Sequence, residues 1–127
     1  MVDSAPRPLR LVAKIKKVTV KMPSYLKQEL PTRIIRDGYN MREKSKWVVE
    51  AVHSLMANKE WEGALLSEVV NKPDTHDVFS IPSDLVNEMA REAGRVSMEK
   101  PSLNANQSTI IRAAINRRLL GFFTKPE

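Results

Sequence analysis

Two segments of this 127-residue chain repeat one pattern. Residues 18–26 (VTVKMPSYL) match residues 77–85 (DVFSIPSDL), and residues 45–52 (SKWVVEAV) match residues 108–115 (STIIRAAI). The copies agree in the order of apolar and polar residues more than in identity. Each copy predicts a short strand, a proline at a helix start, a first helix, a turn and a second helix. This duplication favours a fold in which two similar strand–helix–helix units share one core.

Before each proline, polar and apolar residues alternate, as they do in a strand with one buried face. The first strand is expected to bury Val18, Val20 and Met22. The buried face of the second is expected to begin at Phe79, because Asp77 interrupts its apolar side. The residues predicted to face outward are Lys17, Thr19 and Lys21 from the first strand and His76, Val78 and Ser80 from the second. An isolated two-stranded ribbon is marginally stable, so we expect an antiparallel pair with helices packed on one face.

After each proline, apolar residues recur every four positions, which is typical of a helix with one buried face. The two matching sets are Leu26, Leu30 and Ile34, and Leu85, Met89 and Ala93. Pro31 falls inside the first helix, where a proline costs about 3 kcal/mol, and is expected to kink or split it. Gly38 is predicted to end this helix, and Ser45 and Ser108 to cap the second helices. The turn of the second copy is expected to be four residues longer than that of the first.

These segments predict a mainly α fold with a two-stranded antiparallel β-ribbon. Residues 1–13 are a predicted flexible basic arm, residues 14–57 the first unit, residues 58–74 a partly helical connector, and residues 75–123 the second unit. One unit alone can neither pair its strand nor bury the apolar faces of its helices. We therefore expect the two units to form one compact domain.

Positive charge is concentrated in the first half of the chain. The net charge is +6; residues 1–74 contain 14 basic and 9 acidic residues, whereas residues 75–127 contain 7 and 6. The residues assigned to the basic arm and its junction with the first strand are Arg7, Arg10, Lys14 and Lys16. Such a distribution favours a polyanionic partner. The few aromatic residues argue against single-stranded nucleic acid, which is bound by stacking.

The repeated pattern resembles the ribbon-helix-helix family of DNA-binding proteins, here as a tandem repeat within one chain. The resemblance covers residues 16–57 and 75–120, and it implies a pseudo-dimer made of two fused ribbon-helix-helix units. It also implies that outward strand residues read bases in the major groove of double-stranded DNA, namely Lys17, Thr19, Lys21, His76, Val78 and Ser80. The amino ends of the second helices would then hold backbone phosphates, through Lys44, Ser45, Lys46, Gln107, Ser108 and Thr109.

Each implied role suits the residue type. Lysine donates to guanine O6 and N7, hydroxyl groups both donate and accept, and valine can contact a thymine methyl group. Free N–H groups at a helix start suit a phosphate. The second strand has no lysine or arginine on its outer face, so the resemblance implies a DNA-binding surface whose two strands differ in charge. Its DNA site is therefore not expected to be a perfect palindrome.

Among tandem members of the family, the chain is most similar to accessory factors of conjugative DNA processing, through its fused architecture, size and basic arm. This similarity implies a plasmid or T-DNA transfer (relaxosome) accessory factor, with a relaxase or another DNA-processing protein as a further partner. The alternatives are a transcriptional repressor of the same fold and a protein-interaction adaptor of a secretion or toxin–antitoxin system. The target sequence and any association beyond the internal pseudo-dimer stay open.

Other classes of chemistry have little support in the sequence. The chain has no cysteine, and two separated histidines do not form a metal site. No nucleophile–base pair or glycine-rich phosphate loop can be identified, so we expect no enzyme activity, no cofactor and no metal. No apolar run approaches the roughly 18 residues of a membrane span. We therefore expect a cytoplasmic protein that does not enter membranes.

Several residues also have a purely structural interpretation. The outward strand residues could form a solvated face, and His53 is predicted to lie on the surface. Trp47 and Trp61 are predicted to pack in the core or connector rather than stack on bases. The remaining predictions concern the C-terminal part: Arg112, Arg117 and Arg118 form a solvated helix face, and Phe122 and Phe123 fold back on the core.

Overall fold

A computed structural model describes residues 14–69 and 72–123 of the chain. The order strand, helix, helix occurs twice, with short 3₁₀ segments between the longer elements. The elements are β1 (Ile15–Met22), α2 (Ser24–Arg36), η1 (Met41–Glu43), α3 (Lys44–Met56), η2 (Trp61–Val69), β2 (Thr75–Pro82), α4 (Ser83–Glu99), η3 (Pro101–Leu103) and α5 (Gln107–Leu119). The predicted mainly helical fold with one two-stranded antiparallel sheet is confirmed. The predicted arm, residues 1–13, lies outside the described residues.

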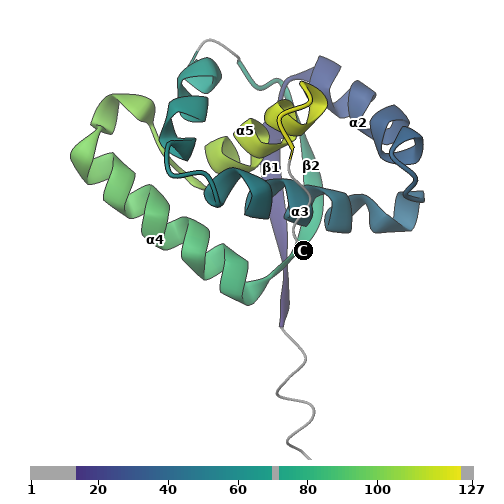
Figure 1. The fold of residues 1–127 in the computed structure, drawn as a ribbon, viewed down its shortest axis with the longest axis horizontal. Coiled ribbons are helices and arrows are strands. Elements are labelled where there is room, and N and C mark those ends of the chain that lie inside the picture. Colours follow the sequence, from purple (N-terminus) through teal and green to yellow (C-terminus); the bar gives the residue numbers. More distant parts are fainter. Residues whose placement is uncertain (1–13, 70–71, 124–127) are drawn as a thin grey trace, which may run out of the picture.

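β1 and β2 form one antiparallel ribbon. Its register runs from the pair Ile15–Pro82 to the pair Met22–Thr75. The backbone pairing continues past one end, where the Ser83 N–H donates to the Lys14 carbonyl at 2.7 Å. Helices α3 and α5 pack against each other and against the ribbon, while α2 and α4 lie at opposite ends of the molecule (Figure 1).

The core lies between the ribbon and the helices. The inward strand residues are buried as predicted. On β2, Phe79 is fully buried and is the next inward-facing residue after the partly exposed Asp77. The four-residue spacings also face the core, since Leu26, Leu30, Ile34, Leu85, Met89 and Ala93 are all buried. Burial of this apolar surface is the main free energy holding the helices on the ribbon.

α2 continues through Pro31 without a break, so the predicted split is wrong. Leu30 and Ile34, on either side of the proline, are buried. Their packing outweighs the local cost of about 3 kcal/mol for a proline in a helix. The helix ends as predicted at Gly38, whose φ is +94°. The Gly38 N–H donates to the Ile35 carbonyl and the Tyr39 N–H to the Ile34 carbonyl, which is a Schellman motif.

The extra four residues of the second copy lie in a helix and not in the turn. The connections between the paired helices span residues 37–43 and 100–106, which are equal in length. α4 instead has 17 residues where α2 has 13. The added turn brings Val96 into the core, and this burial explains why the helix continues.

The predicted serines do not cap the second helices; asparagines cap α5 and η1, the 3₁₀ turn that leads into α3. Asn40 accepts from the Arg42 N–H and forms a capping box with Glu43, so the chain turns helical before α3 begins. Asn106 forms the equivalent box with Thr109 at the start of α5. Ser45 and Ser108 are the second residues of α3 and α5 and do not occupy the N-cap position, from which a side chain caps the helix.

The connector is partly helical, as predicted, and its helical part is the 3₁₀ segment η2. Trp61 and Leu65 are buried, and Glu62 accepts from Arg95 at 2.8 Å and from Lys100 at 3.1 Å. These hydrogen bonds hold the pKa of Glu62 below its ordinary value. The ion pairs of Glu62 with Arg95 and Lys100 attach η2 to α4 and to the residue that follows it.

Within the described ranges, no helix has the length and apolar character of a membrane span.

Candidate nucleic-acid interface

The ribbon presents six side chains on the face away from the core. The register pairs Lys17 with Ser80, Thr19 with Val78, and Lys21 with His76. Five of these residues are exposed, and Ser80 is partly exposed. The strands thus bring together the three predicted outward residues of each strand on one continuous surface.

This surface is more basic on β1 than on β2. Neither Lys17 nor Lys21 forms an ion pair with any residue that the structure describes. Lys14 and Lys16 are exposed at the end of the same strand, whereas Arg7 and Arg10 lie outside the described residues. The outer face of β2 adds one histidine and no lysine or arginine. A surface with free ammonium groups can attract phosphate.

The two lysines predicted to bind phosphate at the amino end of α3 differ in their contacts. Lys44 Nζ lies 2.9 Å from Asp77 Oδ1 and 5.2 Å from the centroid of the Phe79 ring, so this lysine is used within the fold. Lys46 is exposed, and its ion pair with Glu43 is long at 3.8 Å. Of these two lysines, Lys46 is therefore the one whose charge is available to a ligand.

Ser45 joins α3 to the ribbon. Its Oγ accepts a hydrogen bond of 2.8 Å from the backbone N–H of Ser80. The donor belongs to a residue on the outward face of the ribbon, so this bond sets the distance between that face and the helix start. The Ser45 hydroxyl thus has a structural role, and its oxygen already accepts one hydrogen bond.

At the amino end of α5, Lys21 lies beside a small surface cavity of about 480 Å³. Its lining residues are Lys21, Pro73, Asn106, Gln107, Ser108 and Arg112. Gln107 and Ser108 are partly exposed, but Thr109 is buried and its Oγ1 accepts from the Asn106 N–H at 2.8 Å. The predicted residues Gln107 and Ser108 are therefore accessible, and the Thr109 side chain is committed to the cap.

Two arginines predicted to be solvated are buried instead. Arg112 donates to the backbone carbonyl of Lys21, and this hydrogen bond connects α5 to β1. Arg118 donates to the Trp47 carbonyl and to Glu50, and its guanidinium lies 3.7 Å from the centroid of the Phe123 ring. The prediction failed because these partners come from segments far away in the sequence. Arg117 is partly exposed.

The remaining structural predictions are mostly confirmed. Trp47 and Trp61 are buried, so neither can stack on a base, and His53 is exposed. Phe123 folds back on Arg118, but Phe122 is 62% exposed, so its predicted burial is wrong. Among the described residues, no group of three or more histidine, cysteine or acidic side chains could hold a metal ion.

One contact that the sequence reasoning missed positions the ribbon against α2. Asp74, just before β2, accepts from the backbone N–H and the hydroxyl of Ser24, both at 2.7 Å. These hydrogen bonds hold the pKa of Asp74 below its ordinary value. A serine after a proline signals a helix start, but nothing local indicates that its partner lies 50 residues away.

Comparisons with models of protein families, with curated proteins and with solved structures gave no match for this chain.

Proposed function

We propose that this chain is a sequence-selective double-stranded DNA-binding protein whose ribbon enters the major groove. The observation that carries this proposal is the register of the two strands. In the repeat alignment Thr19 corresponds to Val78, and these two residues are also direct partners across the ribbon. Two units related by an approximate twofold axis through this pair would have that register.

The other outward pairs follow the same symmetry. Lys17 corresponds to His76 in the repeat but pairs with Ser80, the counterpart of Lys21. A pseudo-dimer of ribbon-helix-helix units accounts for this crosswise pairing. A two-stranded ribbon fits the major groove, where base edges carry a distinct donor and acceptor pattern for each pair.

The charges and the positions of the helix ends also support binding of double-stranded DNA by the ribbon. The unpaired Lys17 and Lys21 would face base edges or phosphates, and the amino ends of α3 and α5 flank the ribbon. Lys46 at one end and Gln107 and Ser108 at the other are the accessible candidates for phosphate contacts. The two halves differ in charge, so the preferred site would be an imperfect palindrome.

The biological role proposed for this binding is that of an accessory factor in plasmid or T-DNA transfer. It rests on the resemblance to conjugative DNA-processing factors, among them the second protein of the Ti-plasmid virC operon. Transcriptional repression by the same DNA contacts is the alternative. A binding site at a transfer origin or border would favour the transfer role, and a site at a promoter would favour repression.

The test begins with selection of duplexes from a random pool by the full chain. The selected duplex is then titrated with the wild type and with the triple variant Lys17→Ala, Thr19→Ala, Lys21→Ala, at two salt concentrations. We expect the variant to lose the preference for the selected duplex over a scrambled one. Wild-type affinity should fall steeply with salt, since phosphate contacts release counterions.

The matched control is Lys27→Ala, a change of an exposed lysine that lies on α2 and outside the ribbon. Circular dichroism should show that both variants remain folded, because the four altered residues are exposed. Retention of sequence preference by the folded triple variant would refute the ribbon as the reading surface. Absence of any duplex binding by the wild type at low salt would favour the protein-adaptor class.

A further inference from the structure

Among the six side chains on the outward face of the ribbon, both lysines belong to β1. The repeat alignment matches Lys17 with His76 and Lys21 with Ser80, and neither counterpart is a lysine or an arginine. Two identical strands would present each lysine twice, once on either strand of the ribbon. In this chain the two sides of the ribbon therefore offer different chemistry to a double-stranded partner.

The backbone groups of the outward residues point to the two edges of the ribbon. Hydrogen-bonded and non-hydrogen-bonded pairs alternate along an antiparallel ribbon. The Ser83 N–H donates to the Lys14 carbonyl at 2.7 Å and marks a hydrogen-bonded pair. Lys17 and Ser80 pair three positions further along, so theirs is a pair of the other kind. The N–H and C=O groups of such a pair face away from the neighbouring strand.

A different helix lies at each edge. At the β2 edge, the Ser80 N–H donates to Ser45 Oγ, at the amino end of α3, at 2.8 Å. At the β1 edge, the Lys21 carbonyl accepts from Arg112 of α5, and the first residues of α5 line the cavity beside this lysine. In the proposed complex these helix starts hold phosphates. The DNA backbone held by α5 therefore runs beside β1, and the backbone held by α3 runs beside β2.

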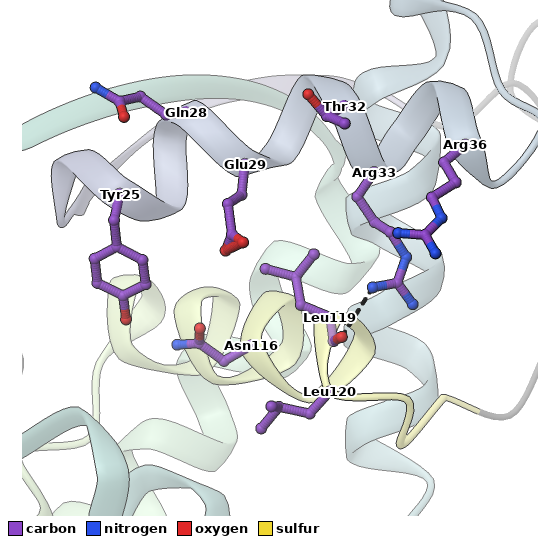
Figure 2. Close-up of a pocket in the computed structure, with 9 residues that line it drawn as sticks. All are labelled: Tyr25, Gln28, Glu29, Thr32, Arg33, Arg36, Asn116, Leu119 and Leu120. Carbon is purple, nitrogen blue, oxygen red and sulfur yellow. Dashed lines mark hydrogen bonds between the residues drawn. The ribbon is translucent and has the colours of Figure 1, made fainter.

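α5 is also held at its other end. Arg33 of α2 donates to the Leu119 carbonyl at 2.8 Å (Figure 2), and to the Arg118 carbonyl at 3.2 Å. A further hydrogen bond of 3.1 Å, to Asp37 Oδ1, orients the same guanidinium group. These contacts and the Arg112 hydrogen bond fix both ends of α5. The amino end of α5 is thus held at the β1 edge before any DNA binds.

From this placement we infer that the DNA site has two guanines on one strand, the strand whose backbone lies at α5. The inference rests on the proposed function and adds to it the strand that carries the bases read by lysine. Guanine N7 lies on the side of the major groove nearer its own backbone, so lysines on β1 reach guanines of that strand. Lys17 and Lys21 are four residues apart, about 13 Å along the strand, and should read guanines roughly three to four base pairs apart.

The duplex that the full chain selects from a random pool tests this inference. We expect two G·C pairs with both guanines on one strand. Inversion of either pair to C·G moves its guanine to the other strand and should weaken binding about fivefold or more. Guanines on opposite strands, or an affinity that neither inversion changes, would overturn the inference and leave sequence-selective binding intact. Absence of preference for any duplex would overturn the proposed function, and the inference with it.

Single substitutions assign each lysine to its guanine. Lys17→Ala should abolish the effect of inverting one of the two pairs, and Lys21→Ala the effect of inverting the other. Both side chains are exposed, and circular dichroism should show that the variants remain folded. Lys46→Ala removes a proposed phosphate contact, so this control should weaken binding to all duplexes alike and keep both inversion effects. A folded ribbon variant that stays sensitive to both inversions, or loses sensitivity to both, would refute the assignment.

Discussion

The guanidinium group of Arg118 donates a hydrogen bond of 2.7 Å from Nη1 to the Trp47 carbonyl and stacks on the Trp47 ring, 4.4 Å from its centroid. The two residues are 71 positions apart and lie on α5 and α3, the helices that pack together beneath the ribbon. Arg118 also donates to Glu50 and to the Tyr39 hydroxyl, which itself donates to Glu50. One arginine therefore joins the C-terminal helix to the first unit.

Replacement of this arginine should destabilise the fold. Arg118→Ala is expected to lower the free energy of unfolding by about 3 kcal/mol or more, because it leaves the partly buried Glu50 without its cation. The measurement is urea denaturation followed by circular dichroism. Arg117→Ala, one residue earlier and partly exposed, should change the same quantity by less than about 0.5 kcal/mol. Equal losses in the two variants would contradict the assigned role of Arg118.

The two lysines at the start of α3 should separate stability from DNA binding. Lys44→Ala removes the partner of Asp77, whose side chain is only 16% exposed, and should lower the melting temperature. Lys46→Ala should leave the melting temperature unchanged but reduce the salt dependence of DNA affinity by about one counterion. Thermal unfolding and salt-dependent titration of each variant measure the two effects. A loss of salt dependence in Lys44→Ala alone would reverse the assignment.

Asp74 should make stability depend on pH. Its hydrogen bonds to Ser24 lower its pKa in the folded state, so the carboxylate stabilises the fold above the ordinary aspartate pKa of about 3.9. This stabilisation should be lost as the pH falls through the lower folded-state pKa. Glu62 acts in the same direction, so the contribution of Asp74 is the difference between the wild type and Asp74→Asn. Melting temperatures that fall in parallel with acid for both proteins would contradict this assignment.

The capping box of α5 should matter more than the serine beside it. Asn106→Ala removes the acceptor of the Thr109 N–H and should lower the free energy of unfolding by about 1 kcal/mol. Ser108→Ala should change it by less than about 0.5 kcal/mol, since the Ser108 hydroxyl has no hydrogen-bond partner in the described part of the chain. Chemical denaturation of both variants measures the difference. If Ser108→Ala proved the more damaging change, the cap would have to be reassigned.

Most of the ribbon and the helix positions could be predicted from local pattern. The alternation around Val18 and Val20 and the spacing of Leu26, Leu30 and Ile34 are properties of short segments, and the structure buries all five residues. The outward face of the ribbon follows directly, because residues between the buried ones must point the other way. The predicted caps failed because several polar residues near each helix start compete, and backbone geometry selects among them.

The sequence by itself determined which segments become strands and helices, and which face of each is apolar, because burial of apolar surface depends on spacing within a few residues. Only the tertiary structure decided where the long polar side chains went. Arg118, Lys44 and Asp74 each find partners more than 30 residues away, and these partners exist only after the core has formed. A charged side chain is buried or exposed according to such partners, which no local pattern encodes.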